Sequence, residues 1–133
     1  MATFLSKLFI DGQELTVLDC SFTFEKGSDN NGKPSTRAQG GQITLLLAAN
    51  RDDSLFGWTL SETATKDGKI VFYKDNAMAK MQELSFTKAY CLYYKQHFNA
   101  ESENPMELEL VISAYEITYG AYTYTSRWPQ AVS

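Results

Sequence analysis

Two long segments in the second half of the chain constrain its fold most strongly. Residues 82–98 form an extended run rich in Tyr and Phe, and residues 106–119 form a second run. In the second run, apolar side chains at every other position alternate with Glu107, Glu109 and Ser113. A period of two residues is typical of a strand with one buried face. The two segments therefore predict a β-sheet rather than a helical fold.

Both segments also contain a break in their alternation. Lys88 interrupts the apolar series of the first segment. In the second segment the apolar side chains change parity after Ala114 and continue at Tyr115, Ile117 and Tyr119. Strands that bend or carry a bulge show such breaks, and barrels use them. We therefore expect a bend or bulge in both strands.

Shorter segments complete the predicted sheet. Residues 5–10, 42–49 and 70–74 predict strands, and the Asp11-Gly12 pair predicts a tight hairpin turn after the first of them. In the strand after this turn an apolar set alternates with a polar set: Leu18, Cys20, Phe22 and Phe24 against Asp19, Ser21, Thr23 and Glu25.

One helix is predicted, at residues 50–60, with Leu55 and Trp58 on one side and Asp52 or Asp53 as the cap. The sequence Lys-Asp-Gly-Lys at residues 66–69 predicts a turn. The 133 residues therefore predict one domain of about seven strands and a short helix. Strand spacing and period favour a mainly β fold, either a sandwich or a barrel.

A long polar segment interrupts the strands at residues 26–41. It contains four glycines and one proline and almost no apolar side chain. Such a segment cannot bury itself, and loops of this length in a compact domain are usually functional or disordered.

The charge of the chain excludes one class of function. A net charge of −4 and a pI near 4.9 argue against a nucleic-acid-binding protein, because phosphates require a basic face. Residues 99–126 contain no Lys or Arg, whereas residues 26–95 hold ten basic and seven acidic side chains. This asymmetry fits either self-association through opposite charges or an ordinary solvated surface.

The sequence predicts no catalytic, cofactor or metal site. His97, the single histidine, lies near a strand end and is interpreted as a surface residue. Asp52 and Asp53 are explained as helix caps, and Glu107 and Glu109 as a solvated strand face. No Gly-rich phosphate loop, GxSxG or HExxH motif occurs. We therefore expect a protein that is not an enzyme.

Cys20 and Cys91 lie in strand-like runs and are predicted to be buried free thiols, although a disulfide between them stays open. The first residues lack the basic leader and apolar run of a signal peptide. No stretch approaches the about 20 apolar residues of a membrane span. We expect a cytoplasmic chain that does not insert into membranes.

The tyrosines near the C-terminus allow two interpretations. Exposed on a sheet, they could stack on sugar rings, which would make the chain a monomeric glycan-binding β-module. Alternatively, they pack a barrel seam or a contact between subunits. The set comprises Tyr115, Tyr119, Tyr122 and Tyr124.

Five segments in a fixed order carry a resemblance to a known family. They are VLDCSFTF, NGKPSTRAQGGQITL, DDSLFGW, KDGKIVFYKDNAMAKMQELSFTKAYC and NPMELELVISA. In this order and spacing they resemble the divergent branch of the Hcp/TssD family, the inner-tube proteins of type VI secretion systems. The resemblance extends over about residues 5–129. It implies a compact two-sheet β-barrel with one helix on its side.

The resemblance also implies a structural role. In this family six copies form a ring, and rings stack into a tube inside a contractile sheath. Contraction drives the tube, its tip and its effector cargo into a neighbouring cell. The implied partners are further copies of the chain, the sheath, tip and baseplate proteins, and effectors. A phage-type tail tube protein shares this architecture and is the alternative.

The resemblance implies specific surfaces as well. Residues 26–41 match the loop that reaches the next ring, with Lys33, Pro34 and Arg37 at its contact and the two cations as ionic anchors. Residues 120–133 form a C-terminal tail. The lumen is implied to be lined by one polar face, either that of Asp19, Ser21 and Thr23 or that of Glu107 and Glu109.

Overall fold

The structure is a computed structural model that describes residues 4–49, 53–74 and 79–128. The described residues form seven strands and one helix, which confirms the predicted mainly β fold. In chain order they are β1 (Phe4–Ile10), β2 (Gln13–Phe22), β3 (Gln42–Ala48), α1 (Ser54–Leu60), β4 (Lys66–Lys74), β5 (Ala79–Phe98), β6 (Met106–Tyr119) and β7 (Tyr122–Thr125).

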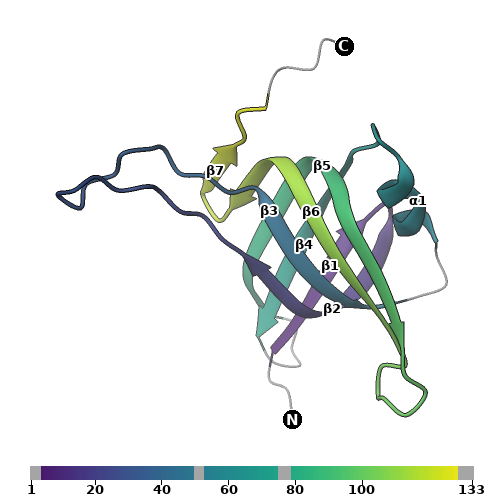
Figure 1. Ribbon diagram of the computed structural model, residues 1–133. Coiled ribbons are helices and arrows are strands. Elements are labelled where there is room, and N and C mark those ends of the chain that lie inside the picture. Colours follow the sequence, from purple (N-terminus) through teal and green to yellow (C-terminus); the bar gives the residue numbers. More distant parts are fainter. Residues whose placement is uncertain (1–3, 50–52, 75–78, 129–133) are drawn as a thin grey trace.

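The strands close into a barrel. Their order is β3-β2-β1-β4-β5-β6-β7, and an additional antiparallel pairing joins β3 to β6 (Figure 1). Six strands thus form the closed wall, and β7 pairs with the end of β6 that extends beyond β3. Closure removes the unpaired edges that an open sheet would expose.

The predicted alternation fills the barrel interior. Ile43, Leu45 and Leu47 of β3 are fully buried, as are Leu110 and Ala114 of β6. Side chains between them point outward, because neighbouring residues of a strand face opposite sides. The apolar residues that alternate along these strands therefore form the core, as the sequence predicted.

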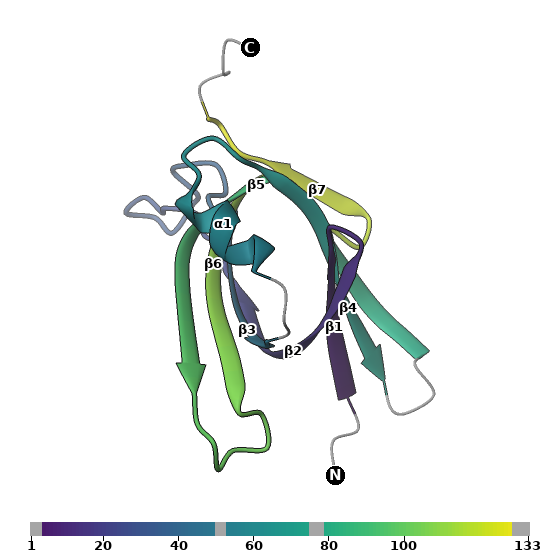
Figure 2. The same ribbon diagram turned by 90° about the vertical axis from the view of Figure 1, so that its right-hand side faces the viewer.

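Helix α1 closes one end of the barrel (Figure 2). Leu55 and Trp58 enter the core with 3% exposure each. The indole Nε1 of Trp58 donates to the carbonyl oxygens of Ala64 at 3.2 Å and Ala89 at 3.1 Å. A helix of seven residues is marginal alone, so these contacts hold it in place.

The breaks in alternation that were predicted for the two long strands are present, and the break in β5 lies opposite the break in β6. The buried side chains of β5 step from Phe86 to Ala89, and those of β6 step from Ala114 to Ile117. Phe86 pairs with Ile117 and Ala89 with Ala114, so the two strands change parity at the same level. Lys88 lies in the step with φ of 50°, a left-handed conformation that is uncommon for a residue with a side chain.

The hairpin between β1 and β2 is confirmed, but one assignment in β2 is wrong. Asp11 and Gly12 both have positive φ, as a two-residue type I′ turn requires. Leu18 was predicted to share the apolar face, yet the register shifts between Val17 and Asp19. Leu18 is therefore 36% exposed, while Val17 is buried instead.

One further local prediction is confirmed in position only, and another is wrong. Asp53 occupies the N-cap position of α1, but its side chain makes no capping hydrogen bond, and Asp52 lies outside the described residues. Residues 66–69 are not a turn but the start of β4. A Cβ on Gly68 would lie 2.7 Å from Cζ of Phe86 and 2.8 Å from the carbonyl oxygen of Phe9. The glycine permits close packing within a strand, not a turn.

Two glycine substitutions test this explanation. We expect Gly68→Ala to lower the free energy of unfolding by about 1–3 kcal/mol, because backbone and ring must move to admit the methyl group. Gly57→Ala in α1 is the control. Its Cβ would meet nothing within 4 Å, so a gain of about 0.5–1 kcal/mol is expected from helix propensity. Urea unfolding at equal protein concentration measures both, and an unchanged midpoint for Gly68→Ala would contradict the packing argument.

Candidate functional site

The polar residues of β2 and β6 lie on one continuous surface. Asp19 pairs with Leu46 of β3, and Leu46 pairs with Glu109 of β6. Glu109 in turn pairs with Lys95 of β5. Directly paired residues point to the same side of a sheet. These four side chains therefore form a row across β2, β3, β6 and β5 on the outside of the barrel.

A second row runs parallel to the first. Ser21 pairs with Thr44, Thr44 with Val111, and Val111 with Tyr93. Glu107 belongs to a third row, opposite His97. We call this surface of β2, β3, β6 and β5 the outer face. The two polar faces that the sequence presented as alternatives are thus one face, although Thr23 lies just beyond the end of β2.

The outer face holds one cross-strand pair of opposite charge. Glu109 faces Lys95 across the β5–β6 ladder, and Glu107 lies opposite His97 in the same ladder. Cross-strand pairs of opposite charge favour this register. Asp19 is exposed at the β2 side of the face. Because α1 covers the end of the barrel, the helix leaves this face uncovered (Figures 1 and 2).

Residues 26–41 project from the barrel as an arm (Figure 1). The sequence predicted a polar loop here, and the structure adds that the loop is a hydrogen-bonded hairpin. Isolated antiparallel bridges join Glu25 to Gln39 and Ser28 to Pro34. At the tip, Oδ1 of Asp29 accepts hydrogen bonds from the backbone N–H of Asn31 and Lys33. Asp29 is a turn residue that sequence reasoning did not single out, although Asp is favoured there.

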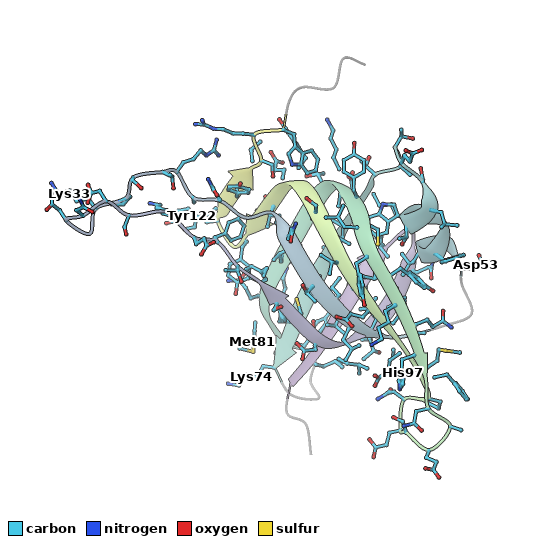
Figure 3. The ribbon with its side chains drawn as sticks, viewed as in Figure 1. Lys33, Asp53, Lys74, Met81, His97 and Tyr122 are labelled. Carbon is cyan, nitrogen blue, oxygen red and sulfur yellow. The ribbon has the colours of Figure 1, made fainter. Side chains whose placement is uncertain are left out.

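The two cations predicted to act together lie apart. Lys33 is exposed at the tip of the arm (Figure 3), and it takes part in none of the ion pairs among the described residues. Arg37 lies at the base, where Nη2 donates to the carbonyl oxygen of Thr125 at 3.0 Å. Its guanidinium also sits 5.8 Å from the ring centre of Tyr124. Arg37 therefore holds the arm to β7 of its own chain.

Tyr124 is the partner that sequence reasoning missed for the arm. Its hydroxyl accepts a hydrogen bond from the backbone N–H of Gly40 at 3.3 Å, and its ring packs edge-on against Phe24. The arm is thus fixed to β7 by a backbone contact, a ring contact and a cation. No local pattern indicates this contact, because Arg37 and Thr125 are 88 positions apart.

The four tyrosines do not form one exposed face. Tyr115 packs against Trp128, with Nζ of Lys88 5.6 Å from its ring centre. Tyr119 is 40% exposed and Tyr122 83% exposed. Because Tyr115 and Tyr124 pack within the chain, the arrangement favours the structural interpretation over a sugar-stacking surface.

The reactive groups of the described residues are dispersed. His97 is exposed, as expected, and no cluster of three or more His, Cys, Asp or Glu in the described ranges could hold a metal ion. Both thiols are free rather than joined. Burial, with a smaller contribution from the Asp19 charge, raises the pKa of Cys20 to about 11. Burial also raises the pKa of Cys91, so burial disfavours the thiolate form of both groups.

Within residues 4–49, 53–74 and 79–128, no helix has the length and apolar character needed to cross a bilayer.

Solved structures share this fold. Hcp1 from Flavobacterium johnsoniae matches with a TM-score of 0.85 and 34% identity, over 92% of this chain and 99% of that chain. Hcp1 from Salmonella typhimurium matches with a TM-score of 0.74 and 13% identity, over 93% of each chain. A chain from the PVC sheath-tube complex of an extracellular contractile injection system matches with a TM-score of 0.53 and 18% identity, over 88% of each chain. The fold is therefore that of an Hcp-like β-barrel.

A model of one protein family covers nearly the whole chain. The model of the hemolysin coregulated protein Hcp (TssD) matches residues 2–129. The chain belongs to this family, a family of tube proteins, which confirms the resemblance found in the sequence. A search of curated proteins found no match.

The arm contact leads to a direct prediction. We expect Arg37→Ala to speed amide hydrogen exchange in the arm, notably at Gly40, because the guanidinium no longer joins the arm to β7. Exchange of the buried β3 amides should not change. Lys33→Ala, which removes a cation from the tip, is the matched control and should leave the base of the arm protected. Equal exchange in both variants would show that Arg37 does not position the arm.

Proposed function

We propose that this protein is the subunit of a type VI secretion inner tube and performs no catalysis. Six copies form a ring, and rings stack into a tube that a contractile sheath propels. The observation that carries the proposal is the family match over residues 2–129 on a chain that folds as the Hcp-like barrel. Sheath, baseplate and tip proteins are its partners in the machine.

The outer face is proposed to line the lumen of the tube. Its rows join four strands without interruption, and α1 lies away from it. Its polar and charged side chains suit a wet wall along which effectors travel. This assignment unites Asp19, Ser21 and Thr23 with Glu107 and Glu109 on one wall.

The arm is proposed to contact the next ring through Lys33 and Pro34. The hairpin bridges and the turn at Asp29 give the tip a defined shape before contact, which lowers the entropy lost on docking. An exposed ion pair contributes only about 0.2–1 kcal/mol. Six repeats of the contact would join two rings firmly yet leave the joint separable. Arg37 then acts by directing the arm, not as a second anchor.

A phage-type tail tube protein remains the second candidate, because the contractile-injection chain has the same fold. Its ring and tube physics would be the same. A monomeric glycan-binding module has less support, since two of its four tyrosines pack within the chain.

Electron microscopy of the purified protein tests the proposal. We expect rings with six-fold symmetry that stack into tubes in the native protein. Lys33→Glu should leave single rings but abolish long tubes, because it reverses the charge at the tip of the arm. Lys26→Glu makes the same charge change near the base of the arm and should still form tubes. Normal tubes from Lys33→Glu would refute the role of the tip. Monomers without any rings in the native protein would refute ring formation.

A further inference from the structure

The end of the barrel opposite α1 is an apolar opening, which we call the mouth. Met81 and Lys74 mark it on one side of the molecule, and Asp53 marks α1 on the other (Figure 3). It forms a groove of about 740 Å³. Its lining is Leu5, Ser6, Thr16, Val17, Leu18, Cys20, Phe22, Phe72, Tyr73, Met81, Gln82 and Tyr119.

The mouth has features of a surface that something covers. Leu18, Met81 and Tyr119 on its wall are 36%, 56% and 40% exposed. The Oγ atom of Ser6 is buried and has no hydrogen-bond partner among the described residues. An unpaired buried hydroxyl costs about 1–3 kcal/mol. Contiguous exposed apolar side chains of this kind usually mark an interaction site.

The same chain carries a matching apolar ridge at its other end. Phe56 is 47% exposed and Leu60 is 67% exposed. They lie four residues apart in α1, so they are neighbours on one side of the helix. The Phe56 ring packs against that of Tyr94, with centroids 5.2 Å apart, which fixes the direction of the ridge. The inner side of α1, with Trp58, is already used by the core.

The charges around the two surfaces are complementary. The α1 end carries the exposed carboxylates of Asp53 and Glu62. The mouth carries Lys74, which is exposed and forms none of the ion pairs of the described residues. Two mouths placed against each other would bring Lys74 close to Lys74, whereas α1 against a mouth brings unlike charges together. The arrangement therefore favours a head-to-tail contact over a symmetric dimer.

We propose that α1 of one copy seats Phe56 and Leu60 in the mouth of the next copy, and that this contact closes the ring. The inference rests on the proposed tube function and names the surfaces that make it. A head-to-tail contact uses different patches on its two sides, so it propagates until the rotation closes. The second copy also covers the apolar wall that the barrel leaves exposed.

Cross-linking between cysteines placed on the two surfaces tests this contact. The variant Leu60→Cys with Met81→Cys is prepared in a Cys20→Ala background, because Cys20 lines the mouth. Cys91 is retained, because it lies in the core with 7% exposure and is out of reach of the reagent. Treatment with a short bismaleimide should give a ladder of covalent species that ends at the closed ring. Either new cysteine alone should give no covalent dimer, because a head-to-tail contact never brings identical residues together.

A second pair of variants measures the contribution of the ridge. Phe56→Ser with Leu60→Ser should raise the concentration needed for ring formation by about 100-fold or more, because two central apolar contacts are lost. Phe98→Ser removes a ring that is 63% exposed elsewhere on the barrel and should leave assembly unchanged. Circular dichroism should show that the barrel is folded in both variants.

The outcomes separate the two claims. If the double-cysteine variant forms rings but gives no covalent ladder, or if rings survive loss of the ridge, the α1–mouth contact is overturned. In either case the mouth has another occupant and the tube function stays intact. Absence of rings from the unmodified protein would overturn both.

Discussion

The pairing of β3 with β6 is the contact on which the rest of the structure depends. Without it the sheet would begin at β3 and end at β7, with a long unpaired edge at each side. With it, Ile43, Leu45 and Leu47 are enclosed on all sides. The same ladder sets Leu46 opposite Glu109 and so aligns the polar residues of β2 with those of β6. One set of hydrogen bonds therefore creates both the buried core and the outer face.

Closure also gives the two faces of each strand different roles. The inward-facing side chains form the core, so any function must be carried by the outer surface, the two ends of the barrel and the arm. The outer face, the arm, the mouth and the α1 ridge are such regions, and the chemistry of each suits contact rather than reaction. The arm shows this division between its base and its tip. Arg37 at the base binds β7 of its own chain, whereas Lys33 lies at the exposed tip of a preformed hairpin. For a subunit that we propose to form stacked rings, defined shape at every contact would lower the entropy lost on assembly.

The sequence correctly predicted the elements that depend on a local residue pattern. It failed at positions whose environment is set by residues far away in the chain. The alternation of β3 and β6, the Asp11-Gly12 turn and the breaks in the two long strands are local patterns, and the structure confirms them. The exposure of Leu18 was missed because a bulge shifts the register between Val17 and Asp19, so the inward-facing series passes from Val17 to Cys20 and leaves Leu18 outside. Gly68 was taken for a turn residue because its real constraint, the approach of Phe86, comes from another strand. The contact of Arg37 with β7 and the mouth are likewise products of three-dimensional packing, so no window of sequence could reveal them.

The central claim is that copies of this barrel meet head to tail and close into a ring of six. Native mass spectrometry of the purified, unmodified protein tests this most directly, because it weighs the assembly without assuming its shape. The account predicts a dominant species of six times the 15.0 kDa chain mass, with dissociation products but no larger closed state of different stoichiometry. A spectrum that shows only the single chain across the accessible concentration range would contradict it.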